Sequence, residues 1–394
     1  MLLKAVLILL QVPLALMTAY LDLLAVAAAF RRREPKPGPP RYHFAVLVPA
    51  HNEEALLPRR LRSRAALDYP RALYEVYIVA DNCTDRTAPL ARTGGVNVRE
   101  RHDSELVGKG YALRWLLGQI KQSARTYDAY VIFDADSVVS PNFLAVMNAN
   151  LVRGDKVIQG YYGVLNADAS WSSGLRYVAL VLYNQLRPRG RAVLNLSAGL
   201  RGNGMCFAAT VLDRFGWEAF TLAEDAEFHL QLVEAGIRVS YADGARVMAD
   251  MPVTLRQARS QNVRWERGRL QMLRAFGPRL LKEGVRLRDP VRLDAVAEQL
   301  VPPLSALVGA SLVLFSVVSI VARGVPRLLA SCILAGQVVY VATGLLLVRA
   351  GPRTYLALLA APALMTWKVY IYAVAATRLR DGRWVRTSRL PGDS

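Results

Sequence analysis

Cysteine is scarce in this chain of 394 residues, and that scarcity excludes two kinds of stabilising site. Cys83, Cys206 and Cys332 are widely spaced and odd in number, which fits neither a disulfide framework nor a zinc site. Free thiols are typical of a reducing compartment. We therefore expect the polar part of the protein to face the cytosol.

The spacing of a phosphate-binding P-loop is also missing. Gly108-Lys-Gly110 places glycines on both sides of a lysine, but it lacks the GxxxxGK[ST] pattern. This argues against a Walker-type NTPase. Lys109 remains either a point charge that reaches a diphosphate or a solvated turn lysine.

Acidic residues are outnumbered, with 31 Asp and Glu against 50 Lys and Arg and a net charge of +19. Nucleic acid, anionic lipid and phosphorylated substrates all suit such a charge. Residues 252–292 hold eleven basic and three acidic residues, interleaved with apolar ones at helical spacing. That pattern is typical of amphipathic helices on an anionic membrane surface, and we assign them to residues 251–295. We expect no nucleic-acid partner.

Charges are nearly absent from residues 1–30, which contain only Lys4 and Asp22. About 20 apolar residues span a bilayer, so this segment predicts one transmembrane helix. A basic, Pro-rich linker follows at residues 31–41, beginning with Arg31-Arg32-Arg33. By the positive-inside preference, the carboxyl end of the helix faces the cytoplasm. The protein is thus expected to be an integral protein of a bacterial-type inner or plasma membrane, with its catalytic domain in the cytosol.

Three further apolar runs lie within residues 296–378, ahead of a basic tail at residues 379–394. They are Leu300–Ala322, Leu328–Val348 and Tyr355–Ala376. Three complete crossings would place the basic tail outside, against the positive-inside preference. We therefore expect the third run, which contains Pro362, to be broken or re-entrant.

Residues 42–250 alternate short β-rich runs with helical stretches. The expected strands are Phe44–Pro49, Tyr74–Ala80 and Tyr130–Asp134, and the expected helices are Glu53–Ala66, Asp85–Arg92 and Lys109–Lys121. This βαβα order predicts a largely parallel sheet in a Rossmann-like α/β domain that binds a nucleotide.

The strand that begins at Tyr130 ends in Asp134-Ala-Asp136. Residues i and i+2 of a strand point the same way, so the two carboxylates lie together at the carboxyl edge of the sheet, where such sheets bind ligands. Adjacent carboxylates repel unless a cation lies between them, and oxygen ligands favour Mg²⁺ or Mn²⁺. Alone, the pair is equally a set of solvated acids.

Other polar residues and one glycine-rich turn are further candidates for the site, and most of them also have a purely structural interpretation. Asp81 either accepts hydrogen bonds from a base or ribose or belongs to a helix-capping turn. Glu224 and Asp225 either complement a helix dipole or supply a general base. Gln261, Arg264 and Trp265 share one helical face, where the arginine suits a diphosphate and the indole a sugar. The Gly202-Asn-Gly204 sequence favours a tight turn that links two segments over a turn that contacts a sugar.

Together these motifs resemble the family 2 glycosyltransferases across residues 42–270, and QxxRW is the most specific of them. The set comprises Pro49-Ala-His-Asn-Glu-Glu54, Asp81-Asn-Cys-Thr-Asp85, Gly108-Lys-Gly-Tyr-Ala-Leu113, Asp134-Ala-Asp136, Glu224-Asp225 and Gln261-Asn-Val-Arg-Trp265. With its membrane flanks, the chain is similar to the branch that holds cellulose, hyaluronan and poly-N-acetylglucosamine synthases.

The resemblance implies a GT-A fold, a nucleotide-sugar donor such as a UDP-sugar, Mg²⁺ or Mn²⁺, and inversion at the anomeric carbon. It implies Asp225 as the catalytic base and Asp134 and Asp136 as the metal ligands. Glu224, Gln261 and Trp265 would lie at the acceptor and diphosphate end. The donor site would contain Pro49, Ala50, Asn52, Glu53, Asp81, Lys109, Asp134 and Arg264.

The chain departs from the family pattern in two places: the first affects hydrogen bonding beside the base, and the second leaves the acceptor open. Ala223 stands where many members have threonine before the Glu-Asp pair, and the chain has few membrane spans for a polymer channel. A secretion partner or a second copy would be needed to complete such a channel. The acceptor is therefore either a growing polysaccharide or a lipid, as in ceramide- or hopanoid-type glucosyltransferases.

Two alternatives remain. A polyprenyl-phosphate glycosyltransferase also joins a cytosolic domain to membrane helices, but it has no need of the intact Gln261, Arg264 and Trp265. A non-enzymatic basic membrane protein that binds anionic lipid or nucleic acid would explain the charge, but not the ordered carboxylates.

Overall fold

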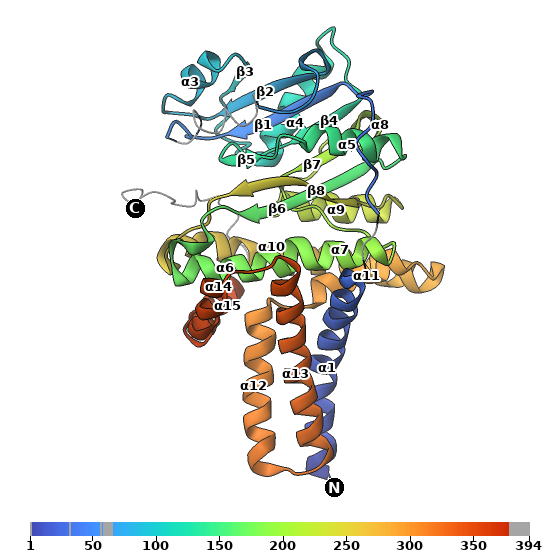
Figure 1. Ribbon diagram of the computed structural model, residues 1–394, viewed down its shortest axis with the longest axis vertical. Coiled ribbons are helices and arrows are strands. Elements are labelled where there is room, and N and C mark those ends of the chain that lie inside the picture. Colours follow the sequence, from blue (N-terminus) through green and yellow to red (C-terminus); the bar gives the residue numbers. More distant parts are fainter. Residues whose placement is uncertain (1, 31–32, 56, 58–65, 378–394) are drawn as a thin grey trace.

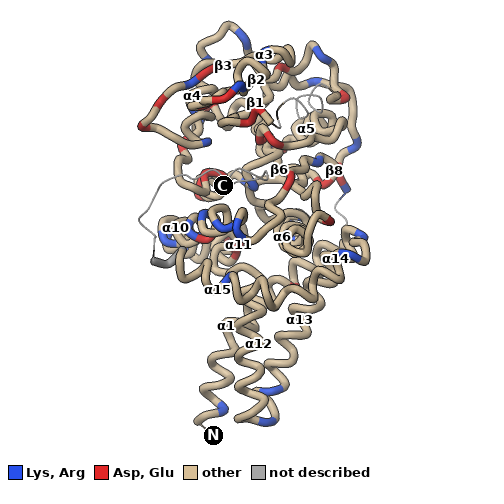
Figure 2. Tube along the Cα trace, turned by 90° about the vertical axis from the view of Figure 1, so that its left-hand side faces the viewer, with Lys and Arg blue, Asp and Glu red and all other residues tan. Residues whose placement is uncertain are grey.

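The computed structural model describes residues 2–30, 33–55, 57 and 66–377. Figure 1 shows three tiers: an α/β domain, a layer of helices beneath it, and a bundle formed by α1, α12 and α13. Charged residues gather in the α/β domain and the helical layer, whereas the bundle carries few of them (Figure 2). The expected α/β domain with apolar helices at both ends is confirmed.

The α/β domain is built on one sheet of eight strands in the order β3-β2-β1-β4-β7-β6-β8-β5. The strands are β1 (Phe44–Ala50), β2 (Tyr74–Asp81), β3 (Asn97–Arg101), β4 (Ala129–Ile132), β5 (Ser137–Val139), β6 (Val157–Val164), β7 (Met205–Ala208) and β8 (Ser240–Ala249). The three strands predicted from the sequence are present with similar bounds. The third is shorter than expected, because β4 ends at Ile132 and the two aspartates lie in the turn that follows.

The expectation of a largely parallel sheet holds in part. Strands β3, β2, β1 and β4 are parallel, and β6 is parallel to β8, but β7 runs antiparallel to both β4 and β6, and β5 runs antiparallel to β8. Parallel neighbours need a crossover that packs on the sheet. The helices between β6 and β7 lie in the layer below the sheet instead (Figure 1), so β7 returns in the opposite direction.

Helices α3 (Thr87–Thr93), α4 (Lys109–Lys121), α5 (Phe143–Val152), α8 (Ala209–Phe215) and α9 (Glu224–Glu234) belong to the α/β domain. Helix α4 shows why these segments are helical. Its buried residues Leu113, Leu116, Leu117 and Ile120 recur at the spacing of one helix face. They pack against the sheet in the same core as Leu47. The helix expected at Glu53–Ala66 falls mostly outside the described residues.

The middle layer consists of α6 (Trp171–Val181), a π-helical turn (Leu182–Leu186), α7 (Arg187–Val193), α10 (Leu255–Leu287) and α11 (Pro290–Leu300). Helix α10 is a continuous helix of 33 residues that begins at a capping box, in which the Thr254 hydroxyl accepts a hydrogen bond from the Gln257 amide. It lies across the bundle axis rather than along it (Figure 1). This is the orientation that its amphipathic, arginine-rich sequence predicts for a helix at a membrane surface.

Four apolar segments are long enough to cross a membrane: Leu2–Ala29, Leu304–Val321, Val325–Leu347 and Pro352–Val374. The first three are α1 (Leu2–Ala29), α12 (Leu304–Val321) and α13 (Val325–Leu347). The fourth is divided into α14 (Pro352–Ala357), a 3-10 turn (Leu358–Ala360) and α15 (Ala361–Thr377). The break expected in this run is therefore present just before Pro362, and both views place α15 near the top of the bundle, against the middle layer (Figures 1 and 2).

A buried network of charges joins the bundle to the middle layer. Arg191 Nε lies 2.8 Å from Asp294 Oδ2, and its guanidinium also pairs with Glu298. Arg187 Nε donates a hydrogen bond of 2.9 Å to the Tyr340 hydroxyl. The Tyr20 hydroxyl donates one of 2.8 Å to Asp294. Residues of α1, α7, α11 and α13 are thereby fixed relative to one another.

Candidate active site

One cavity of about 1920 Å³ runs from the carboxyl ends of β1 and β4 down to the membrane helices. Nearly every residue predicted for the site lines it, although these residues come from segments far apart in the sequence. They are Pro49, Ala50, Glu53, Asp81, Lys109, Asp134, Asp136, Glu224, Asp225, Gln261, Arg264 and Trp265. Because these motifs line one cavity, they can act together on one ligand.

Lys109, at the start of α4, connects three parts of the site. Its Nζ lies 2.6 Å from Asp134 Oδ1 and 3.8 Å from Glu224 Oε1, and it also donates a hydrogen bond to the carbonyl of Gly202. The neighbouring carboxylates raise the pKa of Lys109 against the opposing effect of burial, so it stays charged. This cation is therefore held among the acids and not in a solvated turn.

Asp134 and Asp136 occupy the turn after β4, and both line the cavity. Asp136 is buried, with 4% exposure, and accepts a hydrogen bond from Ser137 Oγ at 3.3 Å. Among the described residues, no three His, Cys, Asp or Glu side chains are grouped as a metal site. Two carboxylates fit a hard divalent cation of the kind that takes its other ligands from substrate phosphates and water.

The predicted donor end is held by hydrogen bonds between the loops after β1 and β2. Asp81 is paired with Arg101 at 2.6 Å, and its backbone carbonyl contacts His51 Nδ1 at 2.8 Å. Asn52 is placed differently from the prediction: it is not among the described residues that line the cavity, and its side-chain oxygen accepts a hydrogen bond from the Thr84 amide at 2.8 Å. Asn52 thus links the loop after β1 to the loop after β2.

Glu224 and Asp225 begin α9 and face the cavity. Burial raises the pKa of Glu224 to about 7, and it also raises the pKa of Asp225. The negative charge of Asp225 adds to the rise for Glu224, while Lys109 opposes the rise for both carboxylates. A carboxylate with a raised pKa is a better proton acceptor near neutral pH than a solvated one.

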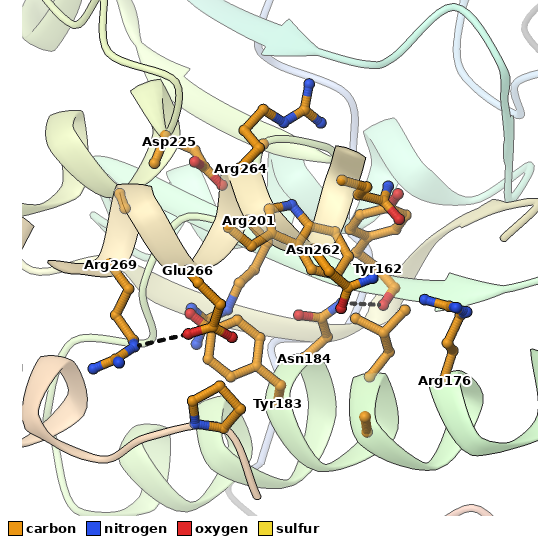
Figure 3. Close-up of a pocket in the computed structure, with 18 of the residues that line it drawn as sticks. Tyr162, Arg176, Tyr183, Asn184, Arg201, Asp225, Asn262, Arg264, Glu266 and Arg269 are labelled. Carbon is orange, nitrogen blue, oxygen red and sulfur yellow. Dashed lines mark hydrogen bonds and ion pairs between the residues drawn. The ribbon is translucent and has the colours of Figure 1, made fainter. Parts of the chain in front are cut away.

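Gln261, Arg264 and Trp265 come from α10, which forms the floor beneath the sheet. Figure 3 shows Asp225 and Arg264 near one another in the upper part of the cavity, above Glu266 and Tyr183. Gln261 is buried, whereas Trp265 remains 42% exposed. The indole is therefore accessible to a ligand, as a stacking platform requires.

The sequence did not identify one wall of the site, formed by Arg201 and Gly202 and supported from behind by Asn203. Gly202 has φ +75°, and a Cβ there would lie 3.3 Å from Asp225 Oδ2. Asn203 is fully buried, and its side chain accepts a hydrogen bond from the Asp134 amide and donates one to Ser137 Oγ at 2.6 Å. Gly202-Asn-Gly204 is the available signal, but its sequence alone favours a linking turn.

The lower part of the cavity is apolar. It is lined by Val178 and Leu182 below the sheet, by Leu304 and Val308 of α12, by Leu334 and Val338 of α13, and by Leu364 of α15. Polar and apolar parts belong to one continuous space. The site therefore extends from the acidic edge of the sheet to the membrane helices.

A family model described as "Glycosyltransferase like family 2" matches residues 39–268. The chain belongs to this family. The match covers the α/β domain and the part of α10 that carries Gln261, Arg264 and Trp265. The membrane helices lie outside it.

Two curated relatives each match about half of this chain or somewhat more. The probable glycosyltransferase YdaM of Bacillus subtilis is 23% identical over 243 residues, which cover 59% of this chain and 56% of YdaM. The beta-monoglucosyldiacylglycerol synthase of Nostoc sp. is 30% identical over 198 residues, covering 48% of this chain and 40% of that protein. The chain thus spans about half the length of the curated relatives it matches.

A solved structure shares the whole architecture. The mannosyltransferase PcManGT from Pyrobaculum calidifontis superposes with a TM-score of 0.62 at 18% identity, covering 97% of this chain and 100% of that one. At this identity the likeness shows the fold alone, over nearly the whole length of both chains.

Proposed function

We propose that this protein transfers one sugar from a nucleotide-sugar donor to a hydroxyl group of a membrane lipid, at the cytosolic face of the membrane. The observation that carries the proposal is the continuity of the cavity from the acidic edge of the sheet to an apolar space between α12, α13 and α15. A soluble, polar acceptor gains no favourable contacts in this apolar space, whereas the acyl or prenyl chains of a lipid can be buried in it.

At the donor end, Asp81 orients the base or ribose, and Lys109 and Arg264 approach the diphosphate. Asp134 and Asp136 would hold Mg²⁺ or Mn²⁺, which when bound neutralises charge on the leaving diphosphate. Lys109 is already paired with Asp134, so it is positioned beside the same phosphates. Fixed positive groups around a leaving diphosphate are typically the largest contribution to catalysis in such sites.

At the acceptor end, Asp225 removes the proton from the lipid hydroxyl. The hydroxyl oxygen forms a bond to the anomeric carbon while the bond from that carbon to the diphosphate breaks. The electron pair leaves with the nucleoside diphosphate, and the configuration inverts because attack comes from the opposite side. Glu224 places a second carboxyl group beside the base, and Trp265 offers an indole against which the transferred sugar stacks.

The names of two similar proteins support a lipid acceptor and a divalent cation. The Nostoc relative is named for synthesis of glucosyldiacylglycerol, and the solved PcManGT complex holds GDP-mannose and Mn²⁺. Polymer synthesis is less well supported by the membrane part: among the described residues three helices form the bundle and the fourth apolar segment is broken.

The test is to offer the purified full chain in lipid nanodiscs a panel of labelled UDP- and GDP-sugars with Mg²⁺ or Mn²⁺. We expect label in the organic phase after extraction, with one sugar per lipid by mass spectrometry and an equal amount of released nucleoside diphosphate. Label in a water-soluble product of high mass would instead establish polymer synthesis. Release of nucleotide without any labelled lipid would reject the proposal.

Replacement of Asp136 by alanine should remove most of the dependence on the cation. Because one of two carboxylate ligands is lost, we expect the concentration of Mn²⁺ that gives half-maximal activity to rise at least about 10-fold. A titration of Mn²⁺ at fixed donor measures this. Asp213→Ala, at an exposed aspartate of the same domain that pairs with Lys121, is the matched control and should keep the wild-type requirement. A wild-type enzyme that works equally well in EDTA would remove Asp134 and Asp136 from the metal role.

Replacement of Glu224 by glutamine should leave the acid limb of the pH profile nearly unchanged. A base must be deprotonated to act, so activity falls as the pH drops through the pKa of Asp225, which burial raises. The charge of Asp225 adds to the rise of the pKa of Glu224 to about 7, so Glu224 takes up its proton first and is largely neutral where Asp225 titrates. Rates at saturating donor between pH 4 and 8 measure the limb. An acid limb that moves by a full pH unit would contradict this order of titration.

A further inference from the structure

Arg176 of α6 is a buried cation that lines the cavity, and no carboxylate of the described residues pairs with it. The residue is 8% exposed, and Nη2 donates one hydrogen bond of 3.3 Å to the hydroxyl of Ser172 in the same helix. Within the part of the chain that the structure describes, Nε has no hydrogen-bond partner. Other buried arginines differ: Arg187, Arg191 and Arg201 each pair with Glu298. A buried guanidinium without a counter-charge is costly, so its retention points to a ligand.

A second cation enters the same cavity from another helix. Lys368 of α15 donates a hydrogen bond of 2.5 Å to Asn262 Oδ1, and its Nζ lies 3.9 Å from Glu266 Oε1. Glu266 is also shared with Arg269 at 3.5 Å. In the described part of the chain, Glu266 thus pairs with Lys368 and Arg269, and no carboxylate neutralises the charge of Arg176. This part of the cavity carries an excess of positive charge.

The position of this excess charge fits the headgroup of a lipid. Asn262 and Glu266, the contacts of Lys368, are next to Gln261 and Trp265 on α10, and so lie beside the predicted site for the acceptor. In Figure 3 the Arg176 guanidinium extends upward from α6 toward the level of Asn262 and Tyr162. The apolar lining from α12 and α13 belongs to the same cavity. A phosphate beside an apolar space is the arrangement of a phospholipid.

We propose that Arg176 and Lys368 bind a phosphate group of the acceptor, so that the acceptor is an anionic, phosphate-bearing lipid and not a neutral one such as diacylglycerol. This inference rests on the proposed lipid acceptor and narrows its class. Arginine suits the role because its planar donors bind two phosphate oxygens at once, while lysine adds a point charge. Burial lowers the pKa of Arg176 to about 10, which still leaves it charged at neutral pH.

The test uses a bacterial lipid extract separated on an anion exchanger into neutral and anionic fractions. Each fraction is reconstituted with the full-length protein in phosphatidylcholine vesicles, and transfer of labelled sugar is measured. We expect wild type to label lipids of the anionic fraction. Arg176→Gln should raise the KM for that fraction by about 10- to 100-fold, as loss of a charged hydrogen bond predicts, with the donor KM unchanged. Lys368→Gln should act in the same direction.

Two further variants separate recognition from folding. Arg176→Lys should restore part of the lost acceptor affinity, because it keeps the charge. Arg279→Gln removes an arginine of α10 that is 65% exposed and paired with Glu234, and it should leave the acceptor KM at the wild-type value. The melting temperature of Arg176→Gln should equal or exceed that of wild type, because an unpaired buried charge is removed.

Three outcomes would overturn the inference. Label in neutral lipids, with Arg176→Gln as active as wild type, would leave the lipid acceptor in place but reject phosphate recognition. A rise in the donor KM instead of the acceptor KM would assign Arg176 to the donor diphosphate. Label in neither lipid fraction but in a soluble glycan would reject the proposed function, and this inference with it.

Discussion

Asp225→Asn is expected to reduce turnover by about 10²- to 10⁴-fold, the usual contribution of a general base. Asparagine keeps the shape of the side chain at the start of α9 but cannot accept the proton. Donor affinity should change little, because the proposed donor contacts come from Lys109 and Arg264. Initial rates at saturating donor and acceptor give the turnover number, and displacement of a fluorescent nucleotide gives the donor affinity.

The control for this variant is Asp213→Asn on the surface of the same domain, where the side chain is 59% exposed and pairs with Lys121. It should retain wild-type turnover. An Asp225→Asn enzyme with normal turnover would show that another group takes the proton, and Glu224 would then be the first alternative. Loss of donor binding in step with turnover would instead place Asp225 on the donor side of the cavity.

Arg191→Met is expected to lower the free energy of unfolding by about 3–5 kcal/mol, the cost of breaking a buried ion pair. Arg191 is 1% exposed and lies between Asp294 and Glu298, so its removal leaves two buried carboxylates without their main counter-charge. Methionine fills much of the same space, which limits the effect to the charge. Chemical unfolding in mixed micelles, followed by tryptophan fluorescence, measures the change.

Adding Asp294→Asn and Glu298→Gln to Arg191→Met should recover part of the lost stability, because the orphaned charges are then removed as well. Arg279→Met, at an exposed ion pair, should shift stability by less than about 1 kcal/mol. If Arg191→Met behaves like Arg279→Met, the network does not fix the membrane bundle to the middle layer.

The regular elements could be predicted where one physical signal dominates. β1 is an uninterrupted apolar run, and α4 has a 3.6-residue periodicity that begins at Gly108-Lys-Gly110, so both were found with nearly their observed bounds. The break before Pro362 was also predictable, because charge balance and proline point to the same place. The direction of β7 was not, since a strand of four residues carries no signal for its partner.

The site could be predicted as a set of motifs but not as an arrangement. Asp134 and Asp136 follow from a strand that ends in two acids, and Asp225 from a pair of acids at a helix start. Asn52 shows the limit, because the same loop presents some side chains to the cavity and turns others toward Thr84. Gly202 and Asn203 were missed for a related reason: they act through backbone and buried amide contacts that composition does not reveal.

The sequence alone determined which kinds of element this protein has, and therefore its fold class, its membrane segments and the residues able to do chemistry. Apolar periodicity and strand-end acids are local properties, so they can be read along the chain. Only the tertiary structure decided that Asp136, Asp225 and Arg264 line one cavity, and that this cavity extends between the membrane helices. It alone also brought Lys368 of α15 into the same space as Arg176 of α6, which has no carboxylate partner among the described residues, because packing sets distances between residues that sequence separation does not.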